Sequence, residues 1–377
     1  MVLCARPIVK LFIFRLHLRL FAFIIEHICR GGVPAAHIFP PGGFAMILKL
    51  EENRVWRLYR GGKLLDELHG RVGEDGSFPE DWLASVVEAI NPPRKNAPAH
   101  EGLSRAVLAC GGTAYLRDLI DTPFNVLTKF LDSAERLPIQ VHPDKETARR
   151  LFQSEYGKTE AWYILGGREI DGEAPYILMG FKSEVTPDTL KALFDKQDIE
   201  GMAALLHKIP VRPGEVYLIR GGSPHAIGAG GLLLEIQEPT DYTISLETHG
   251  TTGNEVPEQL IHQGLGFEKM FECFHYNKQS IEELLASVCM ESKELSPGYE
   301  ELISCDDTPC FCLRRMRVTE TRVQPAGDLP YTLAVTRGEG TVGGIPVTQG
   351  DCLFVSAGQA AYEITGEMEL LQCLPPR

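Results

Sequence analysis

The sequence lacks several features that would point to particular classes of protein. Its ten cysteines include no CxxC pair, so no cysteine zinc site is indicated, and we expect free thiols in a reducing compartment. It contains no internal repeat and no low-complexity tract, and no long basic stretch follows residue 46. With a net charge of −14, these absences argue against a disulfide-stapled domain and against a nucleic-acid-binding protein.

The first 45 residues also lack a clean membrane span. The apolar run 11–25 is short and is interrupted by Arg15, His17 and Arg19. A basic amphipathic targeting helix or membrane-surface helix is one interpretation of this segment. We favour another, in which residues 1–45 are an extension from a mis-assigned start and translation begins at Met46. The protein would then be cytoplasmic, without stable membrane association.

The rest of the chain predicts a mainly β fold built from jelly-roll barrels. Short apolar segments are separated by Gly and Pro turns, most regularly in residues 331–374. Thr186, Pro187 and Asp188 form a helix start, which predicts a helical insertion over about 186–208. We expect a catalytic domain over 46–255, followed by a helical connection and a second barrel over 256–377. Residues 331–374 contain no histidine, since His275 is the last in the chain, so we expect no second metal there.

Four polar residues lie in or beside apolar, strand-like segments. Gln140 and His142 are two apart in IQVHPD, so both side chains leave the same face of a strand. Glu160 lies in GKTEAWYIL and His225 in GGSPHAIGAGG. Imidazole, carboxylate and amide oxygen together suit zinc or a similar divalent ion. A histidine near a strand end is more often a hydrogen-bonded polar residue, so on the residues alone both interpretations stay open.

Three segments in order, LDSAERLPIQVHPDKETARRLF, YGKTEAWYIL and IRGGSPHAIGAGGLLLEIQEPTD, resemble the type I phosphomannose isomerases. The resemblance covers most of the chain from about residue 46. It implies a cupin fold and one zinc ion per chain, held by Gln140, His142, Glu160 and His225. It further implies the interconversion of mannose 6-phosphate and fructose 6-phosphate through an enediolate.

Two lysines and two acids complete the predicted pocket. Lys129 lies within the apolar strand NVLTKFL, where a lysine is rare unless it is paired, and Lys158 precedes Glu160 by two. The resemblance makes both substrate contacts, whereas an ion-paired strand-edge lysine and a solvated loop lysine are the alternatives. Glu235 and Asp241 match acidic residues near the active site of the family, and these two or a metal-linked water are our candidates for the base. A turn cap is the alternative for Asp241.

The sequence departs from the family pattern at two positions. Ser245 stands where the family usually has an arginine, and a serine supplies no fixed cation. Pro138 stands where a phosphate-contacting serine is common, and proline donates no hydrogen bond. One hypothesis is that Arg220 points into the pocket instead.

These departures leave other functions open. A metal-binding cupin without isomerase activity, acting as a sugar-binding or regulatory protein, is the main alternative, and an isomerase of a different aldose is another. An iron-dependent oxidoreductase is less favoured, because the ligand set differs from two histidines and one carboxylate with open positions. We expect a phosphosugar as partner, no nucleic acid, and an oligomeric state that the sequence does not define.

Overall fold

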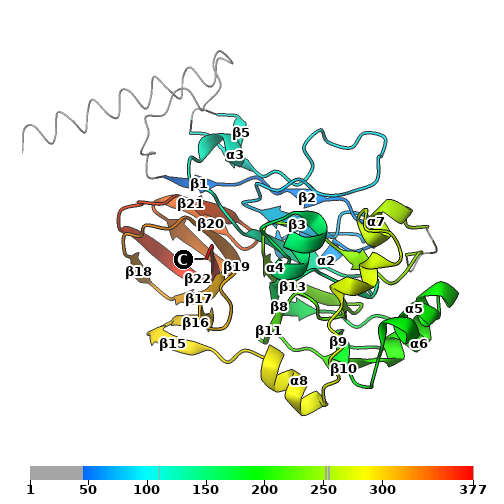
Figure 1. The fold of residues 1–377 in the computed structure, drawn as a ribbon. Coiled ribbons are helices and arrows are strands. Elements are labelled where there is room, and N and C mark those ends of the chain that lie inside the picture. Colours follow the sequence, from blue (N-terminus) through cyan, green and yellow to red (C-terminus); the bar gives the residue numbers. More distant parts are fainter. Residues whose placement is uncertain (1–45, 110, 251–252, 254, 377) are drawn as a thin grey trace, which may run out of the picture.

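The computed structural model describes residues 46–109, 111–250, 253 and 255–376. The predicted N-terminal extension, residues 1–45, lies outside the described residues, so the hypothesis about the start stays a prediction. The described part consists of antiparallel sheets with a few short helices, which confirms the predicted mainly β fold (Figure 1).

Two sheets from the first part of the chain surround the predicted site. One has the order β11-β8-β13-β6-β3-β2 and the other β10-β9-β12-β7-β14. Their inner faces share one apolar cluster, to which Leu131, Trp162, Met179 and Ile227 contribute. The strands of the first sheet are Val216–Ile219, Glu160–Gly167, Gly231–Gln237, Leu127–Asp132, Glu80–Leu83 and Arg54–Val55 in that order. Those of the second are Leu206–Pro210, Tyr176–Phe181, His225–Ile227, Gln140–Val141 and Ile244–Ser245.

The predicted helical insertion forms two helices, α5 (Pro187–Lys196) and α6 (Ile199–Ala204). The Thr186 side chain accepts a hydrogen bond from the Thr189 N–H in a capping box, with Pro187 in the first turn. The predicted end near residue 208 is wrong, because β10 starts at Leu206. His207 and Lys208, which fall inside the predicted insertion, belong to this strand, and the strand pairs with β9.

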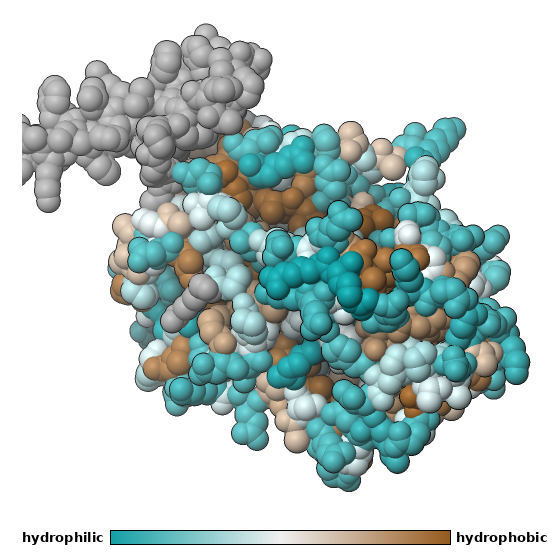
Figure 2. Space-filling view, in the orientation of Figure 1, coloured by the Kyte–Doolittle hydropathy of each residue, from teal (hydrophilic) through white to brown (hydrophobic). Residues whose placement is uncertain are grey.

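The other helices are short and lie in the connections. They are α2 (Lys63–Leu68), α3 (Leu116–Leu119), α4 (Lys145–Thr147), the π-helical turn η2 (Ala148–Phe152), α7 (Glu258–His262), the 3-10 helix η3 (Lys269–Cys273) and α8 (Ile281–Val288). None of the helices in the described residues is long and apolar enough to cross a membrane. On the face shown in Figure 2, hydrophilic residues predominate and apolar residues form smaller patches between them.

The C-terminal strands form a third, larger sheet, whose path is β1-β21-β19-β22-β17-β16-β15, with β18 on β22 and β20 on β19. Its interior is filled by apolar side chains such as Leu333, Val335, Leu353 and Leu370. A small hairpin, β4 (Arg105–Val107) with β5 (Thr113–Tyr115), forms a separate two-stranded sheet, and an isolated bridge from Ala106 to Leu50 links it to the segment after β1. The strands of the third sheet are Ile47–Lys49, Cys352–Val355, Tyr331–Val342, Tyr362–Leu374, Cys312–Val318, Tyr299–Ile303, Lys293–Ser296, Thr321–Gln324 and Ile345–Thr348, in the order named above.

The first strand, β1, pairs with β21, with Ile47 opposite Val355. The start of the predicted catalytic segment therefore completes the C-terminal sheet. The boundary that we predict at residues 255–256 stays a prediction.

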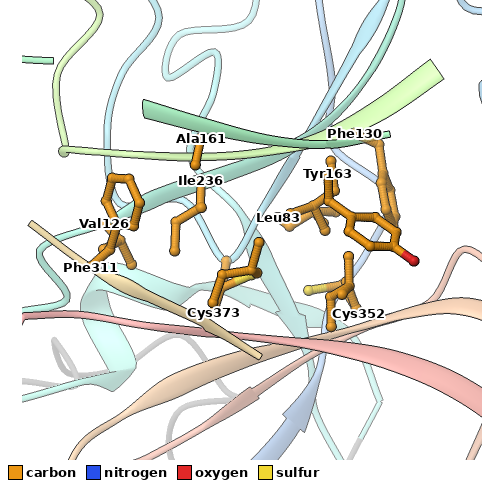
Figure 3. Packing of buried hydrophobic residues seen from close by; sticks show 14 of the residues in the cluster. Leu83, Val126, Phe130, Ala161, Tyr163, Ile236, Phe311, Cys352 and Cys373 are labelled. Atoms are coloured by element: carbon orange, nitrogen blue, oxygen red, sulfur yellow. The ribbon is translucent and has the colours of Figure 1, made fainter. Parts of the chain in front are cut away.

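An apolar interface joins the first sheet to the C-terminal sheet (Figure 3). Ala161 and Tyr163 of β8 point into this interface, together with Phe311 and Cys373 from the C-terminal sheet. Side chains alternate along a strand, so Trp162 points the other way, into the inner cluster. Strand β8 thus packs against apolar clusters on both faces. Glu160 is its first residue and lies at the edge of the inner cluster.

Candidate active site and metal centre

The four predicted metal ligands lie together where the two sheets of the first part meet. Gln140 of β7 is paired directly with His225 of β12, and His142 follows β7. Nε2 of His142 lies 3.1 Å from Oε2 of Glu160, and Nε2 of His225 lies 3.5 Å from Oε1. The amide nitrogen of Gln140 is 3.3 Å from Nε2 of His225. The structure brings the four together, and their role as metal ligands stays a prediction.

Both imidazole rings are held so that Nε2 faces Glu160. Nδ1 of His142 donates to the Tyr242 carbonyl at 2.8 Å, and Nδ1 of His225 donates to the Ser223 carbonyl at 2.9 Å. Burial and the nearby Lys158 lower the pKa of His142 to about 3, and burial lowers the pKa of His225. Neutral imidazole is the ligating form, and a backbone carbonyl on the other ring nitrogen is a usual partner of a metal-binding histidine.

Glu160 is fully buried, and its Oε2 lies 3.1 Å from Nε2 of His142 and 3.4 Å from Nζ of Lys158. Although burial opposes ionisation, Lys158 and His142 hold the pKa of Glu160 well below its usual value. Its Oε2 receives no hydrogen bond from the described residues. A buried carboxylate oxygen without a hydrogen bond is costly, and a divalent cation between Glu160 and the two Nε2 atoms would satisfy it. The donor set therefore fits zinc.

A row of side chains crosses the first sheet beside this cluster. Lys129 of β6 is opposite Trp82 of β3 on one side and Glu235 of β13 on the other, and Glu235 is opposite Trp162 of β8. Lys129 is ion-paired, as the alternative interpretation expected, but it lies on a central strand and not at an edge of the sheet. Its Nζ lies 3.0 Å from Oε1 of Glu235 and 3.5 Å from Oε2 of Glu80.

Glu235 is held at both oxygens. Trp162 Nε1 donates to its Oε2 at 3.2 Å, and Lys129 lies at Oε1. Burial and the charge of Glu160 raise the pKa of Glu235 to about 7, despite the opposing effect of Lys129. Glu235 thus changes charge near neutral pH, which is a property of many proton-transferring groups.

Asp241 is buried and tied to an arginine. Arg57 Nη1 and Nη2 lie 3.2 and 3.1 Å from Oδ2 and Oδ1 of Asp241, and the Ile90 N–H donates to Oδ2 at 2.8 Å. Both oxygens of this carboxylate therefore accept hydrogen bonds, and Oδ2 accepts two, whereas Oε2 of Glu235 accepts one.

Lys158 is buried and its Nζ lies 3.1 Å from Nε2 of His142 and 3.4 Å from Oε2 of Glu160. The alternative of a solvated loop lysine is therefore wrong. The Ser245 hydroxyl donates to the Glu247 carbonyl and accepts the Glu247 N–H, so it is used within its own turn.

The hypothesis that Arg220 points into the pocket is wrong. Its side chain is exposed and donates to the carbonyls of Ser287 and Asp307 at 2.8 and 3.3 Å. Arg220 follows the last residue of β11, and its hydrogen bonds link it to α8 and to the loop that precedes β17.

One cavity lies beside these groups, and Gln140 lines it whereas His142, Glu160 and His225 are not among its lining residues. Among the predicted residues it is lined by Gln140, Lys158, Lys129, Glu235, Asp241 and Ser245. Pro138 also lines it, and Leu131, Leu137 and Ile227 form part of its apolar wall. Two lining residues, Arg57 and Glu80, were missed at the sequence level. One sign of each is visible in the sequence: Arg57 is a charged residue within the aromatic segment RVWRLY, and Glu80 is a charged residue within the buried strand EDWL.

The chain has a jelly-roll fold of the cupin type, and its histidine–carboxylate cluster lies beside a cavity that Gln140 and Lys158 line. No family model matches the chain. The chain is 31% identical over 180 residues to the mannose-6-phosphate isomerase ManA of Bacillus subtilis, which covers 46% of this chain and 55% of that protein. It is 26% identical over 258 residues to the mannose-6-phosphate isomerase of Streptococcus mutans, covering 66% of this chain and 73% of that one. A third relative, the probable mannose-6-phosphate isomerase GmuF of Bacillus subtilis, is matched over 42% of its length, so the chain spans about half of ManA and of GmuF.

Solved structures show the same fold. The mannose 6-phosphate isomerase of Bacillus subtilis superposes with a TM-score of 0.66 at 20% identity, covering 87% of this chain and 99% of that one. A putative mannosephosphate isomerase from Archaeoglobus fulgidus gives a TM-score of 0.65 at 19% identity over 90% of this chain and all of that one. The predicted resemblance is confirmed: the chain is a sequence relative of the mannose-6-phosphate isomerases and has the cupin fold of the phosphomannose isomerases.

Proposed function

We propose that this protein is a zinc-dependent aldose–ketose isomerase that interconverts mannose 6-phosphate and fructose 6-phosphate in the cytoplasm. Two relatives that match segments of this chain are named mannose-6-phosphate isomerase. The observation that carries the proposal is the position of the four predicted ligands, because Gln140 lines the same cavity as Glu235 and Lys158. One predicted metal ligand and the candidate proton-transferring group therefore line the same cavity.

Gln140, His142, Glu160 and His225 would hold one zinc ion per chain. When bound, zinc supplies positive charge that orders the site and polarises substrate oxygens. Lys158, beside the same cluster, adds a further cation toward the cavity, where a phosphosugar needs cationic partners.

Glu235 is the base that we favour over Asp241. The reaction moves a proton between C2 and C1 of the open-chain sugar, so one carboxylate can accept that proton and return it. Lys129 and Trp162 fix the two oxygens of Glu235, which orients the group toward one position in the cavity. Negative charge grows on the sugar oxygens of the enediolate, and the cations of the cavity stabilise it.

A direct test compares two histidine variants of the full chain. His142→Ala should lose both zinc and turnover of mannose 6-phosphate. The matched control, His100→Ala, removes a half-buried histidine that pairs with Glu88, outside the cluster, and should keep both. Fructose 6-phosphate formation and zinc content per chain are measured on the same samples. Zinc bound by the wild-type protein without turnover would contradict the isomerase and support the non-catalytic alternative.

A further inference from the structure

The cavity contains an arginine that no sequence motif singled out. Arg57 follows β2 and its side chain lines the cavity together with Gln140, Lys158 and Glu235. Its side chain is only 11% exposed. A buried arginine needs partners for its charge, because an unpaired buried charge is costly.

Carboxylates hold the Arg57 guanidinium in one orientation. Asp241 takes Nη1 and Nη2 through its two oxygens, and Nε lies 3.1 Å from Oε1 of Glu80. The guanidinium also lies over the Trp82 ring, 5.0 Å from its centroid. Although burial opposes it, Asp241 and Glu80 raise the pKa of Arg57 further above its usual value. The group is therefore a permanent and fixed cation.

One donor of this fixed cation remains available. A guanidinium has five N–H groups. Nη1 donates to Asp241 and to Asn91 at 3.2 Å each, Nε faces Glu80, and Nη2 donates once, to Asp241. The second N–H of Nη2 has no hydrogen-bond partner in the described part of the chain. Because Arg57 lines the cavity, a donor without a partner in the protein is suited to a ligand oxygen.

The other cations near the cavity contact different groups from those that Arg57 contacts. Lys129 lies between Glu80 and Glu235, and Lys158 faces the ligand cluster. Arg136 forms a bidentate pair with Glu247. Arg57 is thus the cavity cation that combines a fixed fork with a free N–H, within the described residues.

We propose that Arg57 donates its free N–H to a sugar oxygen on which negative charge develops during the reaction; this rests on the proposed isomerase function. The local charge favours a sugar oxygen over the phosphate group. Asp241 balances the Arg57 charge and Glu80 adds a second carboxylate, so a dianionic phosphate at this donor would meet two negative groups. A hydroxyl or carbonyl oxygen is neutral in the ground state and gains charge only in the transition state. Arg57 is therefore a catalytic residue whose contribution appears in kcat rather than in KM.

The test uses Arg57→Lys in the zinc-loaded full chain. The lysine keeps a charge for Asp241 and Glu80, so folding is preserved, but it lacks the planar fork. The matched control is Arg60→Lys, an exposed arginine three residues on that donates to the Asp75 carbonyl. Loss of one transition-state donor typically lowers kcat by ~10²–10³-fold, so we expect Arg57→Lys to lower kcat by at least ~10-fold with KM nearly unchanged. Zinc content and the inhibition constant of inorganic phosphate should stay at the wild-type values.

A double variant, Arg57→Met with Asp241→Asn, removes the ion pair as a unit and should also lower kcat while zinc is retained. If Arg57→Lys keeps kcat within about twofold of the wild type, the role of Arg57 is wrong while the isomerase stands. If Arg57→Lys instead raises KM and the phosphate inhibition constant together at unchanged kcat, Arg57 binds the phosphate and the proposal is overturned. A wild-type protein without turnover would contradict the isomerase and the Arg57 role together.

Discussion

Replacing Lys129 by methionine tests whether the charged row beneath the cavity is a buried network. The side chain of Lys129 is 4% exposed and contacts Glu235 and Glu80, whose side chains are 3% and 4% exposed. Lys129→Met keeps most of the volume but leaves Glu235 without its cation. Removing one partner of a buried ion pair typically costs about 3–5 kcal/mol, so we expect a loss of that size in the free energy of unfolding at pH 8.

The loss should depend on pH in a defined direction. The folded pKa of Glu235, about 7, lies above its unfolded value of 4.5, so the folded state holds this proton more tightly. Stability from this group is present at low pH and is lost as the pH rises from 4.5 through 7. Without Lys129 the folded pKa rises further, and the cost of Lys129→Met should therefore be larger at pH 8 than at pH 5.5.

Denaturant unfolding of metal-free protein, followed by tryptophan fluorescence, measures this effect. Lys63→Met is the matched control, because Lys63 is 43% exposed and should change stability by less than about 0.5 kcal/mol. Lys129→Met combined with Glu235→Gln should recover much of the loss, because no buried charge is then left unpaired by the change. A single variant within about 1 kcal/mol of wild type at pH 8, or no recovery in the double variant, would refute the reasoning.

Four further outcomes follow from the same contacts. Glu235→Gln should lower kcat by ~10²–10⁴-fold with zinc content unchanged, as steady-state kinetics and metal analysis will show; loss of zinc would instead make Glu235 part of the metal site. Asp241→Asn should lower kcat less than Glu235→Gln in the same assay, because Asp241 is engaged by Arg57. Arg57 and Lys129 hold the pKa of Glu80 below its usual value against burial, so its stabilisation is present above pH 4.5 and is lost as the pH falls. Acid titrations of stability should therefore be flatter in Glu80→Gln than in the wild type. Thr186→Ala should cost about 1 kcal/mol of stability, seen in denaturant melts, without changing turnover.

Much of the candidate site could be predicted because each ligand lies in a local pattern. Gln140 and His142 share a strand face by their spacing, and Glu160 and His225 flank strand-like segments. The helix start at Thr186 was predictable for the same reason, since a cap is defined by adjacent residues. The mainly β architecture followed from the regular turns of the C-terminal segment.

The remaining features depend on contacts between distant segments. Arg57 reaches Asp241 across 184 positions, and no spacing rule connects them. Arg220 was placed wrongly because strand position alone does not say whether a terminal side chain turns inward or toward α8. Residues 206–210 form strand β10 instead of continuing the helix after Ala204, because pairing with β9 provides hydrogen-bond partners for their backbone.

Zinc titration of the chelator-treated full chain, with turnover of mannose 6-phosphate recorded at each addition, tests the central claim most directly. We predict that turnover rises in proportion to bound zinc and stops rising at one zinc ion per chain, and that His142→Ala shows neither binding nor turnover. Full turnover in the metal-free protein, or saturation with zinc without any fructose 6-phosphate formed, would contradict the account.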